Sequence, residues 1–313
     1  MEFKVFIDGE AGTTGLKVAE RLQAHPHVQI LRVDEAERKN AAARADMMAA
    51  SDVTILCLPD EAAVEAVTLA QASQTRLIDA SSAHRIDPDW VYGFAELQPG
   101  QRDAIANGKL ITNPGCYPTG FLALARPLIA SGLLSNTALV CAPAVSGYSG
   151  GGKAMIAKHD AGDLHPAFSY GTNLQHKHLG EMTLYSGLKT PPIFMPSVGD
   201  FYAGMLVHLP LHADQIVGSA TGKMIYDCLA DWYQGSAVVR MGAAAANHAD
   251  VPPMLAADAL AGRNDMELFV FSDATEQRFW LTARLDNPVE GACGAAVHNM
   301  FMALGRDDHF GLY

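Results

Sequence analysis

Several features that would assign this chain of 313 residues to a particular protein class are missing from it. Its five cysteines are scattered, and no Cys-x-x-Cys pair occurs, so the pattern supports neither a disulfide framework nor a zinc site. No apolar run reaches membrane-spanning length, and the first five residues lead directly into a strand without a signal-peptide pattern. We therefore expect a cytoplasmic protein with no membrane partner and no bound metal.

A basic surface stripe is also missing. The formal net charge is −12, and the lysines and arginines do not gather in runs that would neutralise a phosphate backbone. This balance argues against a nucleic-acid partner. What the chain does have is hydrophobic material, at 49% of its residues, which is enough for a sizeable core. Its length is large for a single core, so we expect two domains.

The first third of the chain alternates short apolar runs with segments of helical spacing. We predict strands at 3–7, 28–33, 53–58, 76–79 and 110–112, and helices at 14–22, 35–50 and 61–72. Alternation of this kind produces right-handed β-α-β units and a parallel sheet covered on both faces. The fold class predicted for this part is therefore α/β.

After residue 116 the rhythm changes to longer strands joined by long connections. We predict strands at 138–145, 204–211, 268–272 and 279–285, a flexible glycine-rich loop at 147–152, and a last helix at 289–304. This pattern indicates an α+β domain with a mixed or antiparallel sheet. We expect the last helix to return to the first domain, which makes the domains 1–116 plus 287–313 and 117–286.

Three glycines, Gly9, Gly12 and Gly15, form a G-x-x-G-x-x-G pattern between the first strand and the first helix. Glycines here let the backbone turn tightly and approach a pyrophosphate at the helix N-terminus, although an ordinary tight turn has the same composition. Asp34 at the end of the second strand favours NAD, because a carboxylate accepts from a ribose hydroxyl. Arg38 and Lys39 favour NADP, so the spacing leaves the cofactor open.

The segment Asn113-Pro114-Gly115-Cys116-Tyr117-Pro118 places a cysteine between a Pro-Gly turn and an apolar stretch of helical spacing. Pro118 suits the first turn of a helix. Cys116 would then lie at the positive end of the helix dipole, where a thiol pKa falls and a nucleophile forms. The alternative is a buried structural cysteine, which is the simplest interpretation of the other four.

Four segments in order resemble the short form of the N-acetyl-γ-glutamyl-phosphate reductase family. They are Asp79-Ala-Ser-Ser-Ala-His-Arg85, Asn113-Pro-Gly-Cys-Tyr-Pro-Thr-Gly120, Ala144-Val-Ser-Gly-Tyr-Ser-Gly-Gly-Gly-Lys153 and His176-Lys-His-Leu-Gly-Glu181. The resemblance implies a Rossmann-like domain followed by an α+β catalytic and dimerisation domain of the semialdehyde-dehydrogenase type. It also implies NADPH-dependent reduction of N-acetylglutamyl 5-phosphate, a step of arginine biosynthesis, by a homodimer or homotetramer.

The resemblance also assigns roles to individual residues. Cys116 is the nucleophile that forms a thioester, and a histidine serves as its base, with His178 favoured over His176. The residues implied to bind the acyl-phosphate substrate are Arg85, Asn113, Ser146, Lys153, His176 and Glu181. The residues implied to bind NADP(H) are Gly9, Gly12, Thr13, Thr14, Gly15, Arg38, Ser81 and Gly150.

Three other functions stay open from the residues alone. A related enzyme acting on aspartyl phosphate would carry the same cysteine and nucleotide loop. A cysteine hydrolase with a vestigial nucleotide fold would cleave esters without a nicotinamide. A non-catalytic NADP-sensing module would bind the cofactor and keep an unreactive thiol.

Overall fold

The computed structural model describes residues 2–218, 221–242, 254–287 and 293–306. These residues form two compact units. Unit 1 comprises the described parts of Met1–Ala95, Gly100–Pro114 and Ala292–Tyr313, and unit 2 comprises those of Glu96–Pro99 and Gly115–Gly291. No helix in the described ranges is long and apolar enough to cross a membrane.

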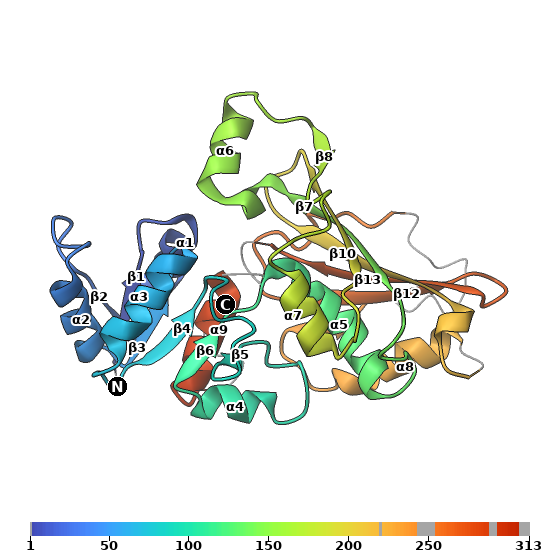
Figure 1. The fold of residues 1–313 in the computed structure, drawn as a ribbon, viewed down its shortest axis with the longest axis horizontal. Helices are drawn as coiled ribbons and strands as arrows, with labels where there is room; N and C mark the ends of the chain where they lie inside the picture. Colours follow the sequence, from blue (N-terminus) through green and yellow to red (C-terminus); the bar gives the residue numbers. More distant parts are fainter. Residues whose placement is uncertain (1, 219–220, 243–253, 288–292, 307–313) are drawn as a thin grey trace. The chain divides into compact units, whose positions relative to one another are not determined.

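Unit 1 is built on a parallel sheet of six strands in the order β2-β1-β3-β4-β6-β5 (Figure 1). The strands are β1 (Phe3–Asp8), β2 (Val28–Leu31), β3 (Val53–Leu56), β4 (Arg76–Asp79), β5 (Val91–Tyr92) and β6 (Leu110–Thr112). Each neighbouring pair is parallel, with Val5 opposite Val53 and Val53 opposite Arg76. The predicted α/β class is confirmed for this unit, and two predicted strands, 76–79 and 110–112, agree residue for residue.

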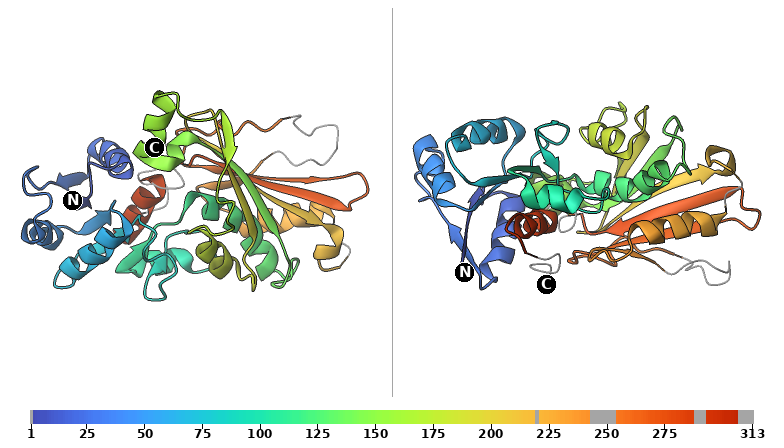
Figure 2. Two further views of the ribbon diagram at one scale, coloured as in Figure 1. Left: turned by 45° about the horizontal axis from the view of Figure 1, so that its top comes forward. Right: turned by 90° about the horizontal axis from the view of Figure 1, so that it is seen from below.

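Helices cover both faces of this sheet (Figure 2). They are α1 (Thr13–Gln23), α2 (Ala41–Ala50), α3 (Asp60–Ala70), α4 (Gln101–Asn107) and α9 (Gly294–Ala303). Helix α2 packs on α3, whereas α9 packs on α1 and α4. One cluster of buried side chains, which includes Phe6, Met48, Leu56 and Trp90, joins the sheet to α2 and α3. Burying each such side chain stabilises the fold by about 1.5–3 kcal/mol, so this cluster holds α2 and α3 against the sheet.

Two predictions for unit 1 need correction. The helix predicted over 35–50 begins only at Ala41, because Asn40 caps it by accepting from the N–H groups of Ala42 and Ala43. The preceding residues form turns. The structure also contains β5 and α4, which the sequence pattern did not indicate, since two and seven residues are too short for a recognisable period.

Unit 2 is built on a mixed sheet of seven strands in the order β11-β12-β13-β10-β7-β9-β8. The strands are β7 (Cys141–Gly147), β8 (Ala167–Ser169), β9 (Ile193–Gly199), β10 (Met205–His212), β11 (Val239–Met241), β12 (Met266–Ser272) and β13 (Arg278–Leu285). Strand β7 runs parallel to β9 and antiparallel to β10. The prediction of a mixed sheet is confirmed.

The helices α5 (Cys116–Ala130), α7 (Leu179–Ser186) and α8 (Gly222–Trp232) lie together in unit 2 (Figure 1). Helix α5 packs on β10 and β13, where the side chains of Val207 and Leu285 meet the helix at Gly120. Successive side chains of a strand point to opposite faces, so His208, which follows Val207, lies on the face of the sheet away from α5. The strand pairing places Trp280 on the same face, the outer face of unit 2.

Two further predictions concern the second half of the chain. Residues 147–152 do not form a loop: Gly147 ends β7, Tyr148–Gly151 form a 3-10 turn, and Gly152 begins α6 (Gly152–Asp160). The last helix begins at Gly294, and residues 289–292 of the predicted helix lie outside the described residues. In the structure this helix contacts α1, α4 and β4 of unit 1.

Candidate functional site

Cys116 is the first residue of α5 in unit 2, as the sequence predicted. Gly115 occupies the N-cap position with an extended backbone, and no side chain among the described residues caps this helix start. Pro118 lies in the first turn, where its missing N–H is not needed. The half-buried Cys116 therefore lies at the positive end of the dipole of a 15-residue helix.

Glu181 lies directly beneath this helix start. Its side chain is fully buried, and its Oε2 accepts a hydrogen bond from the backbone N–H of Gly115 at 3.0 Å. The Gly115 carbonyl in turn accepts from the hydroxyl of Thr119 at 2.8 Å. Glu181 thus fixes the backbone on which Cys116 begins the helix.

His176 and His178 stand in the turn that leads into α7, so their i, i+2 spacing does not belong to a strand. The backbone N–H of His178 donates to Nδ1 of His176 at 3.2 Å, and the two rings lie 4.6 Å apart in a T-shaped arrangement. The ring centre of buried His178 is 6.0 Å from that of Tyr117, the neighbour of Cys116. His176 is half-buried and lies 5.8 Å from Tyr170.

Two tyrosines that the sequence did not single out complete this group. The hydroxyl of Tyr117 donates to Oγ of Ser146 at 2.8 Å. Burial raises the pKa of Tyr170 to about 12, the neighbouring Cys116 thiol acts in the same direction, and the hydrogen bond with Tyr117 opposes them. Tyr117 was visible within the cysteine motif, whereas Tyr170 lies in an unremarkable segment.

The glycine-rich turn of unit 2 is held by Asn287, another residue missed in the sequence. Its amide accepts from the N–H of Gly204 at 2.9 Å and donates to the carbonyl of Gly147 at 3.2 Å. A Cβ at Gly150 would lie 2.7 Å from the Asn287 amide nitrogen, so any larger residue would displace this amide from its hydrogen bonds. Lys153 follows on the exposed side of α6.

In unit 1 the three predicted glycines form the turn from β1 into α1. Gly9 has a φ of +89°, which favours glycine, and a Cβ on it would lie 2.4 Å from the carbonyl oxygen of Cys57. A Cβ on Gly15 would lie 2.4 Å from the carbonyl oxygen of Gly9. Gly12 precedes α1, whose first residues are Thr13 and Thr14, and no side chain in the described ranges caps this helix. These features fit a phosphate at the helix N-terminus.

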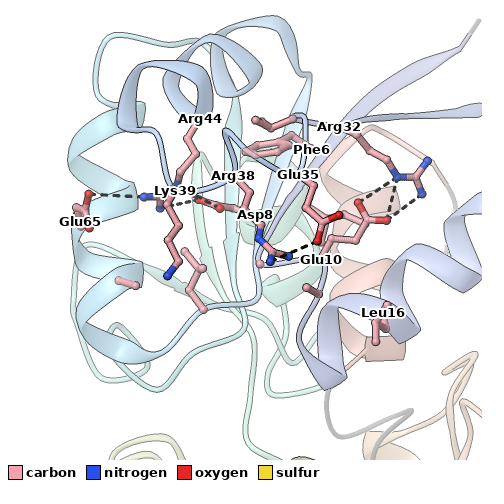
Figure 3. A pocket seen from close by; sticks show the side chains of 16 residues that line it. Phe6, Asp8, Glu10, Leu16, Arg32, Glu35, Arg38, Lys39, Arg44 and Glu65 are labelled. Atoms are coloured by element: carbon pink, nitrogen blue, oxygen red, sulfur yellow. Dashed lines mark hydrogen bonds and ion pairs between the residues drawn. The ribbon is translucent and has the colours of Figure 1, made fainter.

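A pocket of about 660 Å³ opens beside this turn (Figure 3). Four cations among the described residues line it, and three are paired with carboxylates that also line it. Arg32 pairs with Glu10 at 2.9 Å, Arg38 with Glu35 at 3.5 Å, and buried Arg44 with Asp8 at 2.8 Å and Glu65 at 3.6 Å. Lys39 has no ion pair in the described part of the chain (Figure 3). Burial raises the pKa of Asp8, and Arg44 opposes that shift. Asp34 is exposed and is not among the described residues that line the pocket.

The remaining predicted residues of unit 1 lie at the carboxyl ends of β4 and β6. Arg85 is buried, and its Nε donates to the carbonyl of Ser81 at 2.9 Å. Asn113 is buried as well; its N–H donates to the carbonyl of Asp79 at 2.7 Å, and its Oδ1 accepts from Asn299 of α9 at 3.0 Å. This edge of a parallel sheet is where α/β proteins bind their ligands.

The structure thus gathers the predicted residues within each unit. Around Tyr117 in unit 2 it brings together Cys116, Ser146, His176, His178 and Glu181. Gly150 and Lys153 belong to the neighbouring turn and α6. Within the described residues no group of three or more His, Cys, Asp or Glu side chains is arranged to hold a metal ion.

Comparison with known proteins agrees with this geometry. A family model described as "Semialdehyde dehydrogenase, NAD binding domain" matches residues 4–107, and one described as "Semialdehyde dehydrogenase, dimerisation domain" matches residues 116–287. The chain is 45% identical to a protein of Trichormus variabilis named N-acetyl-gamma-glutamyl-phosphate reductase, over 99% of both chains. A protein of Brucella ovis with the same name is 45% identical over 98% of this chain and 100% of its own.

The chain belongs to the N-acetyl-γ-glutamyl-phosphate reductase family. Among solved structures, aspartate semialdehyde dehydrogenase II of Vibrio cholerae, solved in complex with ASA, is similar with a TM-score of 0.70 and 17% identity, over 99% of this chain and 100% of that one. Aspartate semialdehyde dehydrogenase of Candida albicans, solved with NADP, is similar with a TM-score of 0.67 and 13% identity, over 97% of this chain and 99% of that one. This reductase family therefore shares the semialdehyde-dehydrogenase fold.

Proposed function

We propose that the chain reduces N-acetylglutamyl 5-phosphate to N-acetylglutamate 5-semialdehyde, with NADPH as reductant and phosphate as the second product. The observation that carries this proposal is the position of Cys116 as the first residue of α5. The preceding Gly115 is held by buried Glu181, and the ring of the following Tyr117 lies 6.0 Å from that of buried His178. The substrate is taken from the printed names of relatives that are 45% identical over nearly the whole chain.

In this mechanism Cys116 is the nucleophile. Its thiolate attacks the acyl carbon, a C–S bond forms, and the C–O bond to phosphate breaks with its electron pair on the leaving phosphate. The hydride that converts the resulting thioester to a thiohemiacetal comes from the nicotinamide of NADPH. The thiohemiacetal then releases the aldehyde as the C–S bond breaks, and the thiolate is restored.

His178 is the acid and base in this scheme. It gives a proton to the oxygen that forms on hydride addition and takes that proton back as the aldehyde leaves. Its support is its burial and its ring contact with Tyr117. His176 accepts from the backbone of His178, so we assign it to orienting that histidine against the substrate.

Phosphate recognition belongs to Arg85 and Asn113 in this proposal. A guanidinium binds phosphate through a two-pronged charged fork. Both side chains are buried at the carboxyl edge of the sheet, which restricts their orientation. Ser146 and Lys153 complete the substrate contacts, and Glu181 contributes by holding Gly115 beneath the reacting carbon.

For the cofactor we propose NADP(H), held by the turn of Gly9, Gly12 and Gly15 with Thr13 and Thr14. Ser81 and Gly150 are assigned to the nicotinamide end of the same cofactor. The pocket beside the turn favours a 2′-phosphate because the acidic residue that would signal NAD, Asp34, lies outside its lining.

Lys39 and Arg38 select the 2′-phosphate in this proposal. Lys39 forms no ion pair with any described residue, and the Arg38–Glu35 pair is long and exposed, so it exchanges readily for a phosphate. We expect Lys39→Met to raise the KM for NADPH about fivefold and to leave the KM for NADH unchanged. Lys4→Met removes the same charge from an exposed position of unit 1 outside the pocket and is the matched control. An equal effect on both cofactors would contradict the assignment.

The macromolecular partner we propose is a second copy of the chain, seated on the outer face of unit 2. Register assigns Ile193, Met195, Phe271 and Trp280 to this face, and three of them are exposed. Exposed apolar side chains that share one face of a sheet favour an interface, in line with the name of the matched dimerisation domain. We expect the native chain to sediment as a dimer or tetramer. Met195→Glu should shift it to monomer, whereas Val217→Glu, at an exposed position outside the strands, should not. A monomeric native chain would contradict this.

A spectrophotometric assay tests the reaction and the cofactor together. The purified chain is given N-acetylglutamate 5-semialdehyde, phosphate, and NADP or NAD in turn. We expect phosphate-dependent reduction of NADP and no oxidation of aspartate semialdehyde. Faster turnover of aspartate semialdehyde would assign the chain to a related enzyme, and activity that does not depend on phosphate would overturn the acyl-phosphate mechanism.

A further inference from the structure

The loop that follows β4 is organised around a buried carboxylate. Asp79 is the last residue of the strand and has no exposed surface. Its carboxylate accepts from the backbone N–H of Ser81 at 2.8 Å, from the Ser81 hydroxyl at 2.7 Å and from Nδ1 of His84 at 2.6 Å. A carboxylate buried in this way costs several kcal/mol of hydration, so its place at the ligand-binding edge of the sheet indicates a function beyond stability.

His84 is held from two sides. Its Nδ1 bonds to Asp79, and its ring stacks on Trp90 with ring centres 4.3 Å apart and planes 16° apart. Trp90 is itself part of the buried cluster under the sheet. The histidine ring therefore rests on a rigid platform, and its short bond to a buried carboxylate is of the strong, charge-assisted kind.

Arg85 follows His84 directly and is bound by the same loop. Its Nε donates to the Ser81 carbonyl at 2.9 Å, and its Nη2 lies 3.4 Å from the Ala80 carbonyl. The carboxylate of Asp79 fixes Ser81 and His84 through hydrogen bonds. The carbonyl groups that orient the Arg85 guanidinium, those of Ala80 and Ser81, belong to the same loop. The outer side of the loop has a separate anchor, because Ser82 donates to Asp60 through its N–H at 2.8 Å and its hydroxyl at 2.7 Å.

We propose that His84 is a positioning residue that acts through Arg85: bonded to Asp79 and stacked on Trp90, it fixes the loop so that the guanidinium meets the phosphate group of the substrate in one orientation. The inference rests on the proposed function, because it takes Arg85 to bind that phosphate. A guanidinium fork loses most of its advantage when its orientation is not fixed, since both bonds must form at once.

The test uses the full chain in the direction of aldehyde oxidation, with inorganic phosphate as the varied substrate. His84→Phe keeps a ring on Trp90 and removes the donor to Asp79, whereas His84→Asn keeps a donor nitrogen at the position of Nδ1 and removes the stack. We expect His84→Phe to raise the KM for phosphate about tenfold, with kcat and the KM for NADP within about twofold. His84→Asn should stay within about threefold of the native KM for phosphate. Ser82→Ala, on the outer anchor of the same loop, should leave all three values unchanged.

A double variant tests whether His84 acts through Arg85. If it does, adding His84→Phe to Arg85→Lys leaves the KM for phosphate where Arg85→Lys alone has put it. Additive effects, or equal losses for His84→Phe and His84→Asn, would overturn the inference. If Arg85→Lys alone does not change the KM for phosphate, the proposed phosphate site itself is wrong. If His84→Phe does not fold, Asp79→Asn carries the same expectation.

Discussion

The bond between Glu181 and Gly115 allows a sharp prediction, because it joins a buried carboxylate to the residue before Cys116. Glu181→Ala removes the acceptor and leaves the Gly115 N–H buried without it. A hydrogen bond to a charged group contributes about 1.5–3 kcal/mol, and the cavity left by the side chain adds to that loss. We expect the free energy of unfolding to fall by about 3 kcal/mol in total.

The same substitution should also slow the reaction. A displacement of the reacting sulfur by about 1 Å costs on the order of 100-fold in rate, and Gly115 no longer has a fixed position without Glu181. Glu181→Gln is the matched control, since its amide oxygen still accepts from the Gly115 N–H at similar length. We expect Glu181→Gln to recover at least half of the lost stability and most of the lost kcat. Urea unfolding and initial rates measure the two effects, and a Glu181→Ala chain as stable and as active as the native one would refute the reasoning.

Three other substitutions test separate parts of the structure. Gly15→Ala places a Cβ 2.4 Å from the Gly9 carbonyl oxygen, so it should cost about 1–3 kcal/mol of stability and weaken NADP binding in a fluorescence titration more than Gly12→Ala, whose nearest contact is 3.2 Å. Equal effects of the two would contradict the close approach. Burial lowers the pKa of His208 to about 4, so the unfolded chain binds the extra proton between pH 6.5 and pH 4 and stability falls as the pH is lowered through that window. Between pH 7 and pH 5 the native chain should lose about 1–2 kcal/mol more than His208→Gln in urea unfolding, and parallel losses would show that His208 is not responsible. Cys116→Ala should keep the native unfolding transition and abolish reductase activity, whereas loss of folding would favour a structural cysteine.

Much of the fold follows from local sequence where a buried strand is bounded by strong turn signals. The strands at 76–79 and 110–112 are apolar runs that end at Asp79 and at Asn113-Pro114, and their predicted bounds agree with the structure. The predicted helix extends too far towards the N-terminus, because residues 35–39, Glu-Ala-Glu-Arg-Lys, are all good helix formers while the cap at Asn40 depends on side-chain geometry. Period alone does not locate such a cap.

The glycine-rich turn after β7 shows where prediction from local sequence fails. Its composition predicted flexibility, yet Asn287 crosses 140 positions of sequence to bond the Gly147 carbonyl. Asn287 packs against Gly150, and the backbone of Phe201 and Tyr202 approaches Gly147; packing partners so far away leave no local pattern. Residues 147–152 are therefore ordered for a reason that no window of sequence contains.

The sequence by itself determined the chemistry available to this protein: a cysteine at a helix start, a nucleotide turn that needs glycine, and arginine and histidine within recognisable motifs. These features are local, since a turn, a cap and a helix dipole depend on residues a few positions apart. Only the tertiary structure decided which groups meet. Glu181 reaches Gly115 across 66 positions, and His84 stacks on Trp90 while it holds Asp79. Such contacts depend on how strands and helices pack, and close packing between distant segments carries no signature in the order of the residues.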